Sequence, residues 1–114
     1  MKIVKRKNED IKIEHAHGGS GSRKVFADSS LVSSEHFEAM THGFLPGGKS
    51  YNWHKHDDIE EIMVVLKGSG MIHDRDGEYS YSAGDVFIFP SNTDHKIVNP
   101  TDVDHEMIFV RIKT

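Results

Sequence analysis

Four side chains in the middle of the chain have the types and the spacing to bind one metal ion. His54 and His56 lie two residues apart, Glu61 follows after a short interval, and His95 comes from a later part of the chain. Three imidazoles and a carboxylate suit a divalent first-row transition metal such as Fe(II), Mn(II), Ni(II) or Zn(II), and the ligand types alone do not select one of them. A metal with open coordination positions could act as a Lewis acid or activate oxygen.

The spacing of these residues sets conditions on the strands that carry them. Residues two apart on a strand point to the same face, with Cα atoms roughly 6–7 Å apart, so His54 and His56 can converge on one ion. Glu61 lies at an odd offset from His56, so the chain must turn between them. Asp57-Asp58 supplies residues that favour such a turn.

Strand parity alone does not decide whether Glu60 or Glu61 faces the metal. If Glu61 faces inward, Met63 and Val65 face inward with it, and Ile62, Val64 and Leu66 face outward. If Glu60 faces inward, the two sets exchange faces. Either arrangement leaves an apolar outer face on this strand. We expect the N-terminal strand or a second subunit to cover that face.

The elements that would carry the four side chains read as strands. Short apolar runs separated by turn residues continue from Phe37 to the end of the chain, which is typical of an antiparallel sandwich or barrel. Asp76-Gly77 is the strongest hairpin signal. No stretch keeps a 3.6-residue apolar period, so we expect little helix. The predicted strands are residues 35–45, 50–56, 61–67, 70–74, 78–82, 85–89, 95–99 and 106–112.

The first 22 residues differ from the rest of the chain. We predict an N-terminal strand and flexible segment over residues 1–22 and a single domain over residues 23–114. Within the first segment, residues 2–4 and 11–13 could form short strands, and the Gly- and Ser-rich run that begins at His17 is expected to be a flexible loop. His15 and His17 repeat the His-x-His spacing without a following Glu. We interpret them as part of a flexible tail, with a lid over a partner's site as the alternative.

Length and composition exclude several classes of protein. The chain has 114 residues, a formal net charge of −4 and no cysteine. One domain fits this length, and disulfides, thiolate metal sites and thiol nucleophiles are excluded. The acidic balance argues against a nucleic-acid binder. The polar N-terminus and the lack of a long apolar run argue against a secretory leader and a membrane span, so we expect a cytoplasmic protein.

Two runs around the four candidate ligands resemble the two motifs of the cupin superfamily, specifically the small single-domain, RmlC-like cupins. The first motif is met by Gly48, His54, His56, Glu61 and Gly68. The second is met by Gly84, Pro90, His95 and Asn99. Gly68 closes the first motif, and only Glu61, not Glu60, has the number of intervening residues to Gly68 that the family shows. Asn92 stands where the family usually has glycine, a mild departure because Asn also tolerates left-handed φ.

The resemblance covers about residues 41–113, with the two motifs at residues 48–99, and it implies a fold and a site. The fold would be all-β, a double-stranded β-helix or jelly-roll barrel of two antiparallel sheets. The metal would lie inside this barrel, held by His54, His56, Glu61 and His95. The habit of the family, together with the apolar outer faces, leads us to expect a homodimer.

The resemblance leaves the reaction open, because one fold serves many functions. We expect a metal-dependent enzyme acting on a small organic acid or a related metabolite, in the manner of a dioxygenase, isomerase or lyase. The alternative is a barrel that binds or senses a small ligand without turnover. The aromatic and methionine side chains that would line the barrel suit a small molecule presenting one or two oxygens to the metal.

Several other polar residues are candidates for lesser roles. His42 is a candidate acid or base if Met40 and Phe44 face inward with it, and a surface residue if the alternate residues do. The inward Arg or Lys expected for a phosphate or sugar-nucleotide substrate is not evident, and Arg111, near the end of the chain, is the only candidate. Asn99 is expected to fix a turn, and His105, near a turn, is expected to be solvated.

Overall fold

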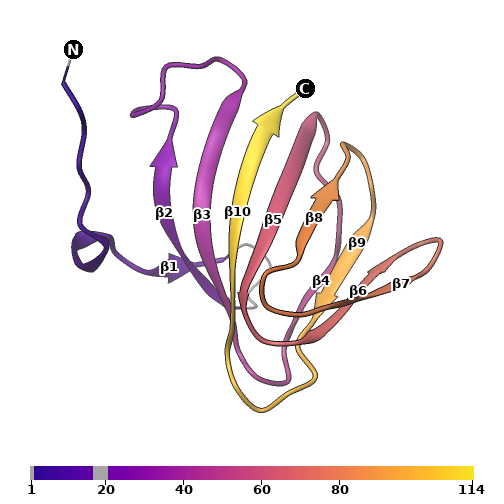
Figure 1. The fold of residues 1–114 in the computed structure, drawn as a ribbon. Coiled ribbons are helices and arrows are strands. Elements are labelled where there is room, and N and C mark those ends of the chain that lie inside the picture. The colour runs from indigo at the N-terminus through magenta and orange to yellow at the C-terminus, as the bar shows by residue number, and fades with distance from the viewer. Residues whose placement is uncertain (1, 17–20) are drawn as a thin grey trace.

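The computed structural model describes residues 2–16 and 21–114 and folds them into two antiparallel sheets that face each other (Figure 1). The larger sheet has the order β1-β2-β3-β10-β5-β8 and the smaller sheet the order β4-β9-β6-β7. The predicted all-β barrel of two antiparallel sheets is confirmed. The elements are η1 (Asn8–Asp10), β1 (Glu14–His15), β2 (Ser22–Asp28), β3 (Phe37–Leu45), β4 (Ser50–His54), β5 (Ile59–Lys67), β6 (Gly70–Asp74), β7 (Glu78–Tyr81), β8 (Val86–Phe89), β9 (His95–Val98) and β10 (His105–Lys113).

All eight strands predicted from residue 35 onward are present, with ends displaced by at most two residues. The prediction missed β2, which pairs with β3 along most of its length. This strand is charged at both ends and therefore lacks the apolar alternation used to find the other strands. Its sequence from residue 23 is Arg23-Lys24-Val25-Phe26-Ala27-Asp28.

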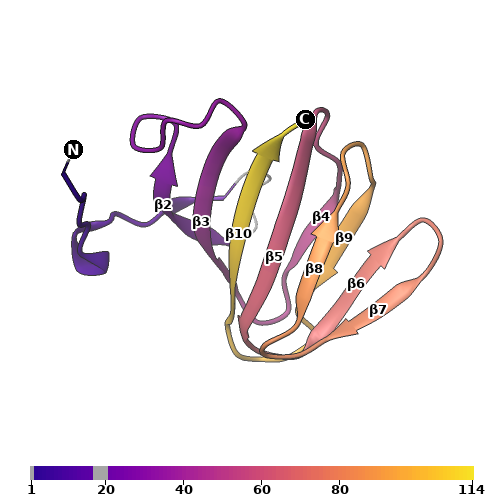
Figure 2. The same ribbon diagram turned by 45° about the horizontal axis from the view of Figure 1, so that its top comes forward.

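The N-terminal part differs from the prediction. Residues 2–4 and 11–13 form no strand; the short strand β1 lies at Glu14–His15 instead and pairs with the start of β2. Residues 17–20, at the beginning of the loop predicted to be flexible, lie outside the described residues. Figures 1 and 2 place the N-terminal segment beside the β2 edge of the larger sheet. No helix among residues 2–16 and 21–114 has the length and apolar character needed to cross a membrane.

The core lies between the two sheets. Met63 and Val65 of β5 are completely buried there, and Glu61 precedes them on the same face. The predicted inward direction of Glu61, rather than Glu60, is therefore confirmed. The other buried hydrophobic residues include Leu45, Ile72, Tyr81, Phe89, Ile97 and Met107.

Two left-handed residues allow the chain to turn beside the site. Asp58 has a φ of 60° and Asn92 a φ of 62°. Asp58 lies in the turn between His56 and β5, as its sequence position predicts. Asn92 donates its backbone N–H to the His56 carbonyl over 3.0 Å, so the two turns are tied together. The left-handed φ of Asn92 agrees with its tolerance for that conformation.

A buried polar chain closes the barrel at the end away from His56. The Tyr81 hydroxyl lies 2.6 Å from His105 Nδ1, and His105 Nε2 lies 3.0 Å from Thr101 Oγ1. Thr101 Oγ1 donates to Asn99 Oδ1 over 2.6 Å, and Asn99 Nδ2 donates to the Leu45 and Val103 carbonyls. Asn99 thus fixes the turn, as expected. The prediction that His105 is solvated is wrong: it has no exposed surface, because partners from β7 and from the loop before β10 surround its ring.

Candidate metal centre

Three histidines from two neighbouring segments converge inside the barrel. His54 at the end of β4 and His95 at the start of β9 are cross-strand partners, and their ring centroids lie 4.3 Å apart. His56 follows two residues after His54, with its ring centroid 5.0 Å from that of His54. One ligand nitrogen from each of the three rings lies within 4.8 Å of the others. The structure therefore brings together the three histidines that the sequence singled out.

Backbone carbonyls orient two of the three rings. His95 Nδ1 donates to the Thr93 carbonyl over 2.8 Å, and His54 Nδ1 donates to the Asn52 carbonyl over 2.5 Å. With Nδ1 protonated, the neutral ring carries its lone pair on Nε2. His95 Nε2 is buried and has no hydrogen-bond partner among the described residues. Such an unpartnered nitrogen, held by a carbonyl on the other side of the ring, fits a metal ligand.

Glu61 lies beside this triad and contacts an arginine. Its side chain is buried, and Oε2 accepts a hydrogen bond from Arg111 Nη1 over 3.2 Å. Glu61 is not among the three side chains whose ligand atoms converge. The structure therefore brings together three of the four predicted ligands and places the fourth in an ion pair next to them.

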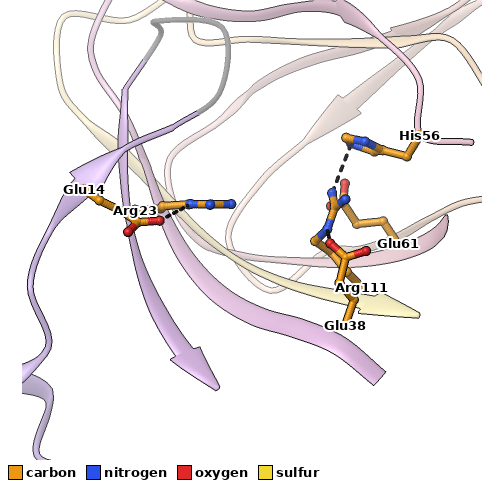
Figure 3. A network of polar contacts seen from close by, with 6 residues as sticks. All are labelled: Glu14, Arg23, Glu38, His56, Glu61 and Arg111. Atoms are coloured by element: carbon orange, nitrogen blue, oxygen red, sulfur yellow. Dashed lines mark hydrogen bonds and ion pairs between the residues drawn. The ribbon is translucent and has the colours of Figure 1, made fainter. Parts of the chain in front are cut away.

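Arg111 connects the triad with two carboxylates (Figure 3). Its Nε donates to Glu38 Oε1 over 2.7 Å, and its Nη1 lies 3.3 Å from His56 Nε2 as well as contacting Glu61. Arg111 faces inward because it lies on the same face of β10 as Met107, which is completely buried. The sequence offered it only as a candidate inward cation, and the structure places it in the site.

Burial and the arginine set the protonation of the site. Burial lowers the pKa of His56 to about 4, and the nearby Arg111 guanidinium acts in the same direction. Burial also lowers the pKa of His95, against the effect of its hydrogen bond to Thr93. Burial raises the pKa of Glu61, although Arg111 opposes that rise. His56 and His95 are therefore neutral near pH 7, which is the state that a metal ligand requires.

Two members of the triad, His54 and His56, line a cavity of about 290 Å³. Trp53, Ile97 and Phe109 supply apolar wall, and Tyr51 adds a hydroxyl to it. Arg23 of β2 also lines this cavity. Sequence reasoning missed Arg23 because it missed the strand; the β-prone pair Val25-Phe26 two residues later was the available signal.

His42 lies outside this cavity. Thr41 and Leu45 of β3 are buried, so His42 faces outward, where its Nε2 lies 2.9 Å from Glu106 Oε1 and its ring stacks on Phe44. Of the two directions that the sequence left open for His42, the structure has the surface one. His42 is therefore not an acid or base inside the barrel, and that interpretation is corrected.

Comparison with known proteins agrees with the fold. The family model described as the cupin domain matches residues 40–111. An oxalate-binding protein of Thermotoga maritima is 32% identical over 105 residues, which cover 89% of this chain and 84% of that protein. A crystal structure of a predicted oxalate decarboxylase from Thermotoga maritima has a TM-score of 0.84 and 27% identity, covering 97% of this chain and 100% of the other. An RmlC-like cupin of Shewanella frigidimarina, at a TM-score of 0.78 and 19% identity over 96% of this chain and 89% of its own, shares the fold.

Proposed function

The chain belongs to the cupin family, and from that premise we propose that it is a metal-dependent enzyme acting on a small organic acid bound in the barrel. The observation that carries this proposal is the unpartnered, buried His95 Nε2, which belongs to the triad of His54, His56 and His95. A buried nitrogen without a partner costs free energy, and a metal ion would remove that cost.

The donor set restricts the metal to a class. His54, His56 and His95 offer neutral imidazole nitrogens, and Glu61 offers a carboxylate next to them. We propose Glu61 as the fourth ligand, which requires that it exchange Arg111 for the metal. This combination suits Fe(II), Mn(II), Ni(II) or Zn(II). When bound, such a metal supplies Lewis-acid polarisation of a substrate oxygen.

The chain's own residues would bind and orient the acid. Arg111 lies beside His56 and can donate to a carboxylate placed near the triad, with geometry that favours planar anions. Burial, together with the charge of Glu61, raises the pKa of Tyr51, so its hydroxyl stays protonated and can serve as a neutral donor. Apolar wall from Ile97 and Phe109 limits the water that reaches the bound acid.

Similarity to an oxalate-related protein of Thermotoga maritima, in sequence and in structure, supports a carboxylate ligand. The protein from Thermotoga maritima that shares 32% of its sequence is an oxalate-binding protein, and a structure with 27% identity is described as a predicted oxalate decarboxylase. Oxalate is a planar dianion that an arginine and a metal can hold together. We therefore place oxalate and related short acids first among the substrates to test.

A second candidate function is ligand binding without turnover. Among the described residues that line the cavity, the only carboxylate is Glu61, and it is already committed to Arg111 or to the metal. Apart from the histidines and the Tyr51 hydroxyl, whose raised pKa keeps it protonated, no other acid or base lines the cavity among residues 2–16 and 21–114. This observation favours a binding or sensing barrel over an enzyme that needs proton transfer.

Turnover separates the two candidates. The purified protein, loaded with Mn(II) or Fe(II), is incubated with oxalate while oxalate loss, carbon dioxide release and oxygen uptake are followed, and His95→Ala is the control. Consumption that requires both the metal and His95 supports the enzyme. Saturable binding of oxalate, with no loss of oxalate over long incubation, contradicts the enzyme and supports the binding barrel.

A further inference from the structure

A second arginine in the cavity has no part in the proposed function. Arg23 lies on β2, on the inward face, as the cross-strand partner of Gly43. Its side chain is mostly buried, and its Nε donates to Glu14 Oε1 over 2.9 Å. Figure 3 shows its guanidinium extending from β2 towards the group formed by His56, Glu61 and Arg111.

The remaining donors of Arg23 are available to a ligand. A guanidinium presents five N–H groups in a fixed plane. Only Nε of Arg23 is bonded to another side chain among residues 2–16 and 21–114, and that partner is Glu14 on the neighbouring strand. Because Arg23 lines the cavity, an anion inside can reach the outer nitrogens.

A hydroxyl lies close to the same place. A Cβ at Gly43 would be 3.1 Å from the Tyr51 hydroxyl oxygen and 3.0 Å from Phe109, so both side chains lie against Gly43, the cross-strand partner of Arg23. No hydrogen bond joins the Tyr51 hydroxyl to another residue of the described ranges. Arg23 and Tyr51 thus offer a cation and a neutral donor on the side of the cavity away from Arg111.

The cavity is too large for a ligand that uses only the triad and Arg111. A volume of about 290 Å³ compares with about 30 Å³ per water molecule in the liquid, so roughly ten water-sized groups could fit. Oxalate joins its two carboxylates directly and leaves part of that space unfilled. Trp53, Ile97 and Phe109 give the cavity apolar wall.

We propose that the cavity binds a dicarboxylate with a short apolar spacer, whose second carboxylate is held by Arg23 and Tyr51. The first carboxylate would lie at the histidine triad and Arg111, so this inference rests on the proposed function. A spacer would contact Phe109 and Ile97, and each anionic end would meet an arginine. The pocket therefore favours a diacid longer than oxalate over a monocarboxylate of the same length.

The experiment measures the affinity of the Mn(II)-loaded protein for a series of diacids from oxalate and malonate to succinate, glutarate and adipate. Each diacid with a spacer is compared with the monocarboxylate of equal chain length, and metal content is measured before and after titration. The variants are Arg23→Gln, which removes the cation, and Glu14→Gln, which breaks the same ion pair but keeps Arg23. Thermal unfolding of both variants checks the fold.

We expect at least one spaced diacid to bind about tenfold or more tightly than its matched monocarboxylate, from a charge-assisted hydrogen bond at Arg23. Arg23→Gln should abolish this preference and leave oxalate and the monocarboxylates unchanged, and Glu14→Gln should retain it. Equal binding of diacids and monocarboxylates, an equal loss for all ligands in Arg23→Gln, or the same loss in Glu14→Gln would overturn the inference while the proposed function stands. Failure of the wild type to hold Mn(II) would overturn both.

Discussion

Arg111 and Glu61 are cross-strand partners on β10 and β5, and Arg111 Nη1 donates to Glu61 Oε2 over 3.2 Å. The carboxylate proposed as the fourth metal ligand is therefore held by a guanidinium next to the three histidines. If Glu61 binds the metal, the ion and Arg111 would compete for its carboxylate. Metal binding would release an Arg111 N–H group for the carboxylate of a ligand, so the metal and an anionic ligand should bind with positive cooperativity.

Arg111→Gln should destabilise the metal-free protein more than the metal-loaded protein. Without the guanidinium, Glu61 loses its partner in a buried position, at a cost of about 1–3 kcal/mol. Bound Mn(II) gives Glu61 another partner and should reduce that cost. Urea unfolding with and without Mn(II) measures the loss of unfolding free energy in the metal-loaded and the metal-free protein. Arg75→Gln, which removes an exposed ion pair with Asp94, is the control and should cost little in either state.

Equal destabilisation of Arg111→Gln with and without the metal would contradict this competition. The variant would then report on the contact with Glu38 alone, which the metal does not touch.

Gly68→Ala should destabilise the protein more than Gly84→Ala. Both glycines have positive φ, +107° and +94°, so both substitutions carry backbone strain. A Cβ at Gly68 would come within 2.1 Å of the buried His105 ring, whereas a Cβ at Gly84 meets nothing within 4 Å. We expect the difference to be about 1–3 kcal/mol, the usual cost of overpacking. Chemical unfolding of the two variants measures it, and equal losses would show that the His105 ring is free to move.

The metal-free protein should lose stability as the pH falls from about 6.5 towards 4. In the folded protein the pKa of His56 is about 4, below its ordinary value of 6.5, and that of His95 is lowered too. The unfolded chain therefore binds protons first as the pH falls, so the stability present above pH 6.5 is lost on the way to the folded pKa. Urea unfolding in the presence of a chelator measures this, with His56→Asn as the comparison.

Between about pH 6.5 and pH 4, the free energy of unfolding of His56→Asn should change less with pH than that of the wild type. Parallel profiles for the two proteins would contradict the lowered pKa of His56. The lowered pKa values of Asp28 and Asp74 act below this window. The raised pKa of Glu61 acts within it in the opposite direction, but Glu61 is present in both proteins, so the difference between their profiles reports on His56.

The outer face of the larger sheet should bind a second copy of the chain. Val86 and Ile88 on the edge strand β8 are 59% and 62% exposed and continue an apolar surface from the strands beside them. The outward residues form two cross-strand rows, Met40, Val110, Ile62 and Ile88, and His42, Ile108, Val64 and Val86. An exposed apolar edge of this kind is rare in a monomer.

Ile88→Lys should therefore dissociate a dimer seen for the wild type by light scattering. Val103→Lys changes an equally apolar residue that is 51% exposed in a loop and should leave the dimer intact. A wild-type protein that stays monomeric at all concentrations would show that this face has no second copy as its partner.

The strands from residue 37 onward and the meeting of His54, His56 and His95 could be predicted from the sequence. The strands follow from apolar runs between turns, and the joint direction of His54 and His56 follows from a His-x-His spacing that strand geometry puts on one face. The position of His95 beside them was implied by the resemblance to the cupin motifs. The direction of His42 could not be predicted, because parity within one strand has two solutions until a neighbouring strand fixes the face. Arg23 was missed with its charged strand, and the burial of His105 depends on Tyr81 and Thr101, whose approach no local pattern indicates.

The measurement that tests the central claim most directly is elemental analysis of the purified protein beside His54→Ala, His95→Ala, Glu61→Ala and His73→Ala. His73 lies on β6, outside the triad, and serves as the matched control. We predict near-stoichiometric iron, manganese, nickel or zinc in the wild type and in His73→Ala, and its loss in the other three. Equal metal content in all five proteins, or no metal in any of them after loading, would contradict a metal centre at these residues.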